Sequence, residues 1–150
     1  MRKRMTNSDW WTDADLIARL DPAGRLFERG LHGVAEDSGV FPYCPVTLKM
    51  KVYPGDVIEP AVIEGWLNTL AEIGRVVVFE VSGKKWGWLS TFHDEQVLQY
   101  PKMPVWPTPA WLIVDEVERG VRTCAAFSVD VAMLDRFKAG QPMLQPPLTA

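Results

Sequence analysis

Residues 60–92 read PAVIEGWLNTLAEIGRVVVFEVSGKKWGWLSTF, and within this stretch a helical pattern gives way to a β-rich one. Its first half places apolar residues at helical spacing, and Gly74 follows as a helix end. Its second half holds two β-rich segments, 75–81 and 86–92, around the turn residues 82–85. We therefore expect an amphipathic helix that is followed directly by a β-hairpin. The apolar face of that helix consists of Ile63, Trp66, Leu67, Leu70 and Ile73.

Upstream of this stretch, the sequence predicts two further helices. Thr12 can cap a short helix that ends at Leu20, and acidic residues occupy its first turn. Asp21-Pro22, a capping residue before a proline at the first helical position, opens a second helix. Gly30 weakens this helix by about 1 kcal/mol relative to alanine, and it would let a neighbouring element approach closely.

Residues 46–53 are ambiguous between two structures. Apolar residues alternate there with threonine and lysine, and this alternation alone favours a strand. A short helix is the alternative.

The last third of the chain predicts a separate group of elements. Four prolines between residues 100 and 109 indicate an extended connector. A second hairpin is expected over 111–127, with its turn at 118–120, and then a helix over 129–137 capped near Ser128 or Asp130. The tail from Gly140 is expected to fray. The predicted organisation is one domain over 1–98, a connector over 99–110, and a hairpin and helix over 111–150.

Composition excludes several classes of protein. The chain has 150 residues, 47% of them hydrophobic, and a formal net charge of −3, which favours a globular domain over a disordered chain. No apolar run is long enough to cross a bilayer, and the polar residues after the basic start argue against a secretory signal. Cys44 and Cys124 lie 80 residues apart and are expected to be small, buried, apolar residues in the reducing cytoplasm.

Charge predicts at most local contacts with nucleic acid. Residues 1–100 hold 11 basic and 14 acidic residues, and residues 101–150 hold five of each. Any contact with phosphates must therefore come from a small patch, although each patch can equally be a solvated surface. The candidate residues are Arg2, Lys3, Arg4, Lys49, Lys51, Lys84 and Lys85.

Nothing in the sequence predicts an enzyme. The chain has no nucleophile-elbow, zinc-protease, phosphate-loop or dinucleotide-binding motif, and its carboxylate pairs are adjacent, as on a surface. His32 and His93 have no second ligand at helical spacing, so we expect neither a metal site nor a cofactor. Most of the tryptophans are expected to pack in the core rather than to stack on single-stranded nucleic acid. This set comprises Trp10, Trp11, Trp66, Trp86, Trp88 and Trp106.

Three helices followed by a hairpin is the order of elements in an α+β winged helix-turn-helix domain. A series of short motifs between Arg4 and Gln96 also resembles the N-terminal domain of phage replication-initiation (replisome-organiser) proteins. The matching motifs are Arg4-Met5, Trp10-Trp11-Thr12, Leu20, Arg25-Leu26-Phe27, Gly30-Leu31, Ala35-Glu36-Asp37, Gly39-Val40-Phe41, Leu48-Lys49, Tyr53-Pro54, Leu67, Leu70, Gly74, Phe79 to Trp86, and Phe92 to Gln96.

The resemblance implies a winged helix, a helix over 46–53, and DNA binding in replication initiation or regulation. This chain departs from the family at two places. Asp94-Glu95 replace the basic residues that follow the wing, and the exposed face of the presumed recognition helix is rich in carboxylates, which repel DNA. That face consists of Glu59, Glu64, Asn68, Thr69 and Glu72.

Two functions therefore remain as hypotheses. The first is double-stranded DNA binding through the wing and the N-terminal arm. The second is a non-enzymatic protein-interaction module that binds a host replication, transcription or defence protein, or a second copy of the chain. The residues expected to serve the second function are Glu64, Asn68, Glu72, Trp111 and Ile113.

Overall fold

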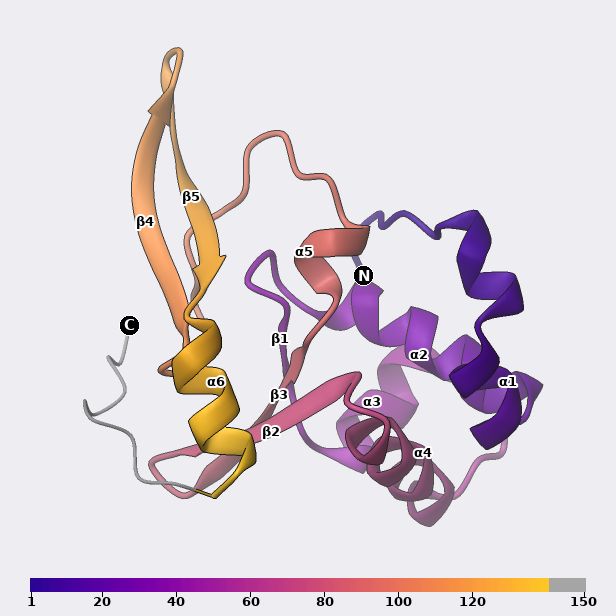
Figure 1. Ribbon diagram of the computed structural model, residues 1–150. Helices are drawn as coiled ribbons and strands as arrows, with labels where there is room; N and C mark the ends of the chain where they lie inside the picture. The colour runs from indigo at the N-terminus through magenta and orange to yellow at the C-terminus, as the bar shows by residue number, and fades with distance from the viewer. Residues whose placement is uncertain (141–150) are drawn as a thin grey trace. The chain divides into compact units, whose positions relative to one another are not determined.

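The computed structural model describes residues 1–140 and shows an α+β architecture of helices and antiparallel sheets (Figure 1). The chain divides into two compact units, and the boundary follows Val97. The elements of the first unit are η1 (Ser8–Thr12), α1 (Ala14–Arg19), α2 (Pro22–Val34), β1 (Val40–Pro42), α3 (Pro45–Val52), α4 (Pro60–Glu72), β2 (Val76–Val81), β3 (Lys84–Leu89) and α5 (Phe92–Glu95).

Capping side chains set the starts of the first two α-helices. Asp13, rather than Thr12, caps α1 by accepting a hydrogen bond from the Leu16 amide at 3.2 Å. Thr12 belongs to the preceding 3₁₀ turn η1. Asp21 caps α2 as expected, accepting from the Gly24 amide at 2.8 Å.

Residues 45–52 form the helix α3, so the alternating pattern was misleading. The reason is that the alternation does not follow burial, because Val46 and Met50 are 55% and 66% exposed. The close packing of residues 45–52 against α2 is consistent with a helix. A Cβ on Gly30 would lie 2.5 Å from Val52 Cγ1, so the glycine makes room for α3.

The sheet of the first unit has the order β1-β3-β2, with all pairs antiparallel. The hairpin β2–β3 was expected, but its turn is only Ser82-Gly83, both with positive φ. Strand β1 was not foreseen, because nearby prolines made this segment read as irregular. Phe41 pairs with Gly87 on β3, where a Cβ would lie 2.2 Å from the phenyl ring.

The core of the first unit lies where the helices meet this sheet. Its side chains come from every helix and strand except η1, and nearly all of them are aliphatic or aromatic. The hydrophobic members that are at most 2% exposed are Leu16, Phe27, Leu31, Ala35, Val40, Phe41, Leu48, Ile63, Leu67, Leu70, Val76, Trp88, Leu89 and Phe92.

The second unit contains a two-stranded hairpin and one helix. These elements are β4 (Leu112–Arg119), β5 (Arg122–Val129) and α6 (Val131–Lys138), and Asp130 caps the helix. The turn is Gly120-Val121 and begins two residues later than the turn expected at 118–120. Trp111 packs on Phe137 with ring centroids 4.5 Å apart, which ties the hairpin to α6. The tail expected to fray lies mostly outside the described residues.

Candidate functional site

The β2–β3 hairpin stands where the sequence predicted a wing, and we refer to this hairpin as the wing. Lys84 and Lys85 begin its second strand, β3, instead of lying in its turn. Both side chains are exposed. The Lys84 Nζ atom lies 4.5 Å from the centre of the Trp86 ring, a cation–π contact that holds the lysine over the indole. Lys85 pairs across the sheet with Glu80. The wing therefore offers one lysine steadied by an aromatic ring and one with an acidic cross-strand neighbour.

The N-terminus of α3 lies beside the start of the wing. Hydrogen bonds from Thr47 lower the pKa of the Cys44 thiol, and the nearby charge of Lys84 lowers it further. Cys44 is thus the partly exposed N-cap of α3, which corrects its assignment as a buried apolar residue. Cys124 is buried as expected, at 2% exposure.

The lysines of α3 lie in its last turn, where the helix dipole favours positive charge. Lys51 is exposed and Lys49 is half-buried. These two residues, together with the wing lysines, are the predicted phosphate contacts that remain accessible on the body of the first unit.

The exposed face of helix α4 carries few side chains that can form hydrogen bonds with the edge of a base. The Thr69 hydroxyl donates to the Gly65 carbonyl of its own helix at 3.1 Å, and Glu72 forms an ion pair with Arg19 of α1. Glu64 and Asn68 are exposed and lie four residues apart on one side of the helix. Within residues 1–140, neither Glu64 nor Asn68 forms a side-chain hydrogen bond or ion pair, and the same is true of Glu59, which precedes the helix as its N-cap.

Helix α4 also faces the segment before α3. Burial raises the pKa of Tyr43, and the charge of Glu64 raises it further, so the two side chains are within electrostatic reach. The Tyr43 amide donates to the Lys85 carbonyl at 3.3 Å. The wing, the start of α3 and the middle of α4 are therefore neighbours in the first unit.

The N-terminal arm is fastened to the end of α2, where the Arg2 amide also donates to the Gly33 carbonyl at 3.0 Å. Arg4 donates to the carbonyls of His32 and Ala35 at 2.9 and 3.0 Å and pairs with Asp37 at 3.0 Å. Its side chain is only 8% exposed. Arg2 and Lys3 are both exposed, although the Arg2 guanidinium also donates to the Ala35 carbonyl at 3.0 Å. Arg4 is thus a structural cap of α2, which removes it from the predicted DNA contacts.

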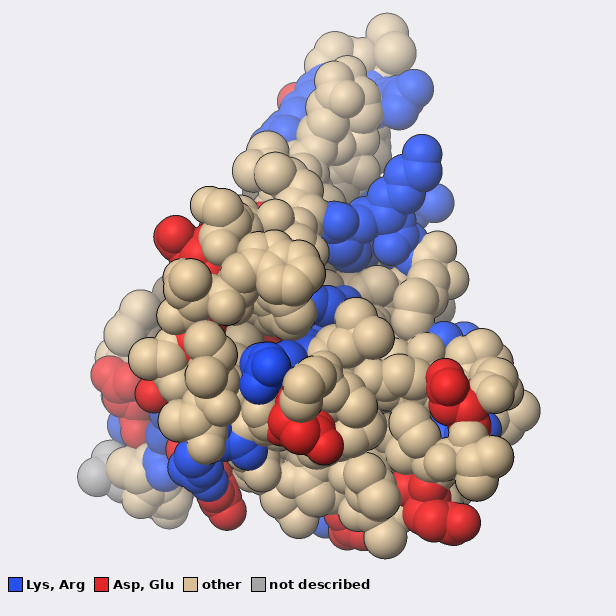
Figure 2. Space-filling model, turned by 90° about the vertical axis from the view of Figure 1, so that its right-hand side faces the viewer, with Lys and Arg blue, Asp and Glu red and all other residues tan. Residues whose placement is uncertain are grey.

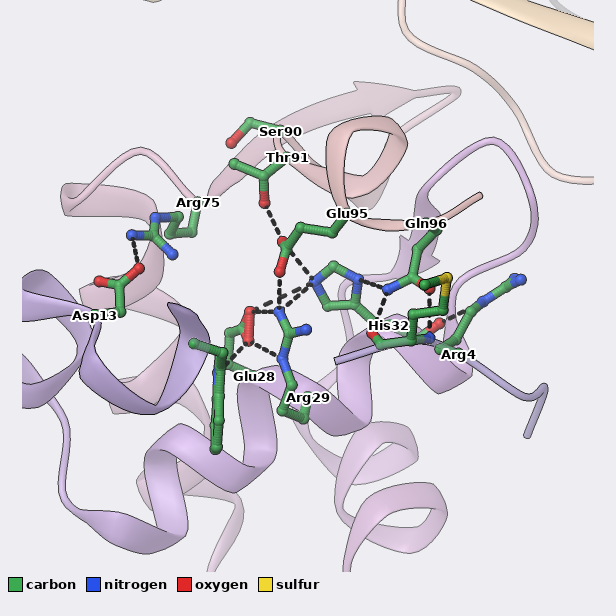
Figure 3. A network of polar contacts seen from close by, with 12 residues as sticks. Arg4, Asp13, Glu28, Arg29, His32, Arg75, Ser90, Thr91, Glu95 and Gln96 are labelled. Atoms are coloured by element: carbon green, nitrogen blue, oxygen red, sulfur yellow. Dashed lines mark hydrogen bonds and ion pairs between the residues drawn. The ribbon is translucent and has the colours of Figure 1, made fainter. Parts of the chain in front are cut away.

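A buried polar cluster, which we call the Arg29 cluster, joins α2 to α5 (Figure 3). It consists of Glu28, Arg29, His32 and Glu95. The Arg29 guanidinium lies between the other three, pairing with Glu28, donating to Glu95 Oε1 at 2.9 Å and lying 3.0 Å from His32 Nε2. Sequence reasoning missed this cluster because Glu95 stood in an adjacent acidic pair that looked exposed. The spacing of Glu28 and His32, one helical turn apart, was the available signal.

The cluster is strongly ionised. Burial alone would raise the pKa of Glu28, but hydrogen bonds from His32 and Arg29, together with the charge of Arg29, lower it to about 2. Burial opposes the charge of Arg29, yet the two carboxylates raise its pKa overall. The Trp10 indole N–H donates to Glu28 at 3.2 Å, and the Thr91 hydroxyl donates to Glu95 at 2.6 Å. These bonds satisfy the charged groups inside the protein.

The side chains of Glu28, His32 and Glu95 have the composition of a metal site, with ligand atoms within 4.8 Å of one another. The arrangement nevertheless disfavours a metal ion. The Arg29 guanidinium already occupies the space between the ligand atoms and supplies the positive charge. The Gln96 amide is oriented by both backbone groups of Met5, at 2.7 and 2.9 Å, and it turns its NH₂ group toward His32 Nδ1 at 3.1 Å.

His32 has polar neighbours at both ring nitrogens. Nδ1 lies 3.1 Å from the Gln96 amide nitrogen, and Nε2 lies 3.0 Å from Arg29 Nη2 and 3.4 and 3.5 Å from carboxylate oxygens of Glu28 and Glu95. Every polar atom of the ring is therefore already in contact with a group of the protein. The cluster is therefore an internal ion-pair network.

The remaining candidate aromatic and histidine residues are mostly structural. Trp66, Trp86 and Trp88 are buried as expected, whereas Trp11 is 72% exposed, against the expectation of core packing. His93 Nε2 lies 2.9 Å from the Asp37 carbonyl, and burial lowers its pKa.

In the second unit, the two residues proposed to contact a partner differ in solvent exposure. Trp111 is 1% exposed, so it belongs to the core and is corrected as an interaction residue. Ile113 is 44% exposed and stays a candidate. The space-filling view shows acidic side chains standing among basic ones, so the face in Figure 2 has mixed charge.

Comparisons with protein-family models, curated proteins and solved structures found no match. Within residues 1–140, no helix is both long and apolar enough to cross a membrane.

Proposed function

We propose that this protein is a winged-helix DNA-binding protein that uses its wing and α3 to hold the phosphate backbone. The observation that carries the proposal is the juxtaposition of the exposed wing lysines with the α3–α4 pair. Lys84 influences the thiol at the N-cap of α3, and the strand carrying Lys85 bonds the backbone of the segment leading into α3.

The order of elements supports the same function. Helix α2, strand β1, helices α3 and α4, and the hairpin β2–β3 follow one another, and the sheet order is β1-β3-β2. In a winged helix-turn-helix domain, the second helix of the motif enters the major groove while the first crosses the backbone. Helix α4 would then be the recognition helix, and Lys49 and Lys51 would lie on the helix that crosses the phosphates. By its resemblance, the DNA would be a phage or mobile-element origin or regulatory site.

The proposal is tested by fluorescence anisotropy of a labelled duplex with random sequence, at low and physiological salt. Each phosphate neutralised by a lysine contributes roughly −0.9 to the slope of log affinity against log salt. The double variant Lys84→Glu/Lys85→Glu should therefore lose most of the affinity for every duplex, and its slope should become shallower by roughly 1.8.

The control is Lys102→Glu/Lys138→Glu, which makes the same change in net charge on exposed residues of the second unit. It should bind with nearly the affinity of the unchanged protein. Equal losses in both double variants would mean that net charge, and not the wing, governs binding. Absence of binding by the unchanged protein at low salt would refute DNA binding.

A second function is favoured by one observation on β4. The amides of Val114, Glu116 and Glu118 point away from β5 in this ladder, and within residues 1–140 they have no backbone partner. An unpaired edge with acidic side chains suits an extended basic segment of a protein partner. Pull-down with the Glu116→Lys/Glu118→Lys variant as control tests it, because that variant should release a partner held by this edge and leave duplex binding intact.

A further inference from the structure

We infer that α4 reads DNA through Glu64 and Asn68, and that the preferred site contains a cytosine and an adenine rather than a guanine contact. This inference rests on the proposed DNA-binding function and specifies the bases recognised by the same site. It follows from which side chains of α4 are available.

The exposed face of α4 loses two of its polar groups to internal contacts. Thr69 bonds the helix's own backbone, and Glu72 pairs with Arg19. Helix α4 contains no lysine or arginine. The side chains that usually contact guanine, Arg and Lys, are therefore missing from the helix that would enter the groove.

Glu59 precedes the helix as its N-cap, so two polar groups remain within α4 itself, and both have defined base preferences. Asparagine can form a bidentate pair with adenine N6 and N7, and glutamate can accept from cytosine N4. Neither group can donate to guanine in the way that arginine does. A carboxylate in the groove also disfavours a base whose exposed edge carries only hydrogen-bond acceptors, because the carboxylate cannot donate to it.

The local surface lets the helix come close to the bases. Ala61 and Gly65 lie beside the two readers on the exposed side, and nothing lies within 4 Å of where a Gly65 Cβ would be. Glu64 and Asn68 are separated by about 6 Å along the helix axis, four residues at 1.5 Å each. That separation corresponds to roughly two base pairs, so we expect the cytosine and the adenine within two base pairs of each other.

The repulsion between Glu64 and the phosphates is the cost of this arrangement. The lysines that would attract the backbone lie on the wing and in the last turn of α3, so backbone attraction and base reading are divided between separate elements. The affinity is then expected to be modest, while the Glu64 position contributes mainly to discrimination.

The test is selection from a duplex library with a randomised ten-base-pair core, followed by affinity measurements on the selected site and on single-base changes. The unchanged protein should enrich a cytosine and an adenine within two base pairs. Replacing that adenine should weaken binding roughly 5- to 150-fold, as expected for a bidentate contact.

Variants assign each base to its side chain. Asn68→Ala should lose the preference at the adenine only, and Glu64→Gln should change the preference at its own position from cytosine toward adenine, because glutamine can pair with adenine N6 and N7. Glu72→Gln is the matched control on the same helix and should keep both preferences. Melting temperatures of all three variants should stay near that of the unchanged protein, because these side chains are exposed.

The outcomes separate the inference from the proposed function. Salt-sensitive binding without a base preference, or with a preference that survives both Asn68→Ala and Glu64→Gln, would overturn the inference and leave the wing as a non-specific DNA binder. An enriched guanine that both variants retain would overturn it as well. Failure to bind any duplex at low salt would overturn the proposed function, and the inference with it.

Discussion

The Arg29 cluster and the wing both contain basic residues, but these residues are buried in the cluster and exposed in the wing. In the cluster, Arg29 is 9% exposed and each nearby carboxylate has a fixed partner, so its charges hold α2 and α5 together. In the wing, Lys84 and Lys85 are exposed, and their charges face water or a ligand. Solvent access, and not residue type, therefore decides whether a charge stabilises the fold or is available for binding.

The largest expected effect comes from removing the centre of the cluster. Arg29→Met keeps much of the side-chain volume but leaves Glu28 and Glu95 as buried carboxylates without their cation. We expect the free energy of unfolding to fall by about 3–5 kcal/mol, as when one partner of a buried ion pair is lost. Urea unfolding followed by circular dichroism measures it.

Arg19→Ala is the control for this substitution, because Arg19 also pairs with a glutamate but is 45% exposed. Its loss should cost less than about 1 kcal/mol. If Arg29→Met and Arg19→Ala had equal effects, the contrast between buried and exposed charges would fail.

The second effect is a pH dependence that belongs to the cluster. The pKa of Glu28 is lowered to about 2, so its contribution to stability is complete above its ordinary range near 4.5. That contribution is lost as pH falls from about 4.5 through about 2, and the full shift corresponds to about 3 kcal/mol. Urea midpoints between pH 7 and pH 3 should fall less steeply in Glu28→Gln than in the unchanged protein. Parallel curves would show that other carboxylates carry the acid sensitivity.

The smallest effect is expected at the wing. Lys84→Ala removes the contact with the Trp86 ring and should lower the free energy of unfolding by about 0.5 kcal/mol, as for an exposed cation–π pair. The same denaturation measurement checks it. A loss comparable to that of Arg29→Met would place Lys84 among the structural charges and weaken its role in binding.

Local signals predicted most helices and both hairpins. Asp21-Pro22 marked the start of α2, and Gly74 marked the end of α4, because these residues act on the backbone next to them. Strand β1 was missed because its pairing with β3 depends on Phe41 meeting Gly87, two residues far apart in the chain. The helix over 45–52 was foreseen through the resemblance, while its own periodicity favoured a strand.

The candidate site divides in the same way. The wing lysines and the acidic face of α4 could be predicted from the sequence, because residues near a turn and on the polar side of an amphipathic helix point toward solvent. The fastening of Arg4 to the end of α2 could not, and neither could the burial of Trp111, since both depend on contacts between distant segments.

The amino-acid sequence alone predicted both hairpins, the apolar helix faces and the small amount of positive charge. Those properties follow from neighbouring residues and from composition. The meeting of Glu28, Arg29, His32 and Glu95 in one buried network became visible only in the three-dimensional fold. Burial and pairing are set by segments that approach in space, and these segments lie up to 67 positions apart in the cluster, from Glu28 to Glu95.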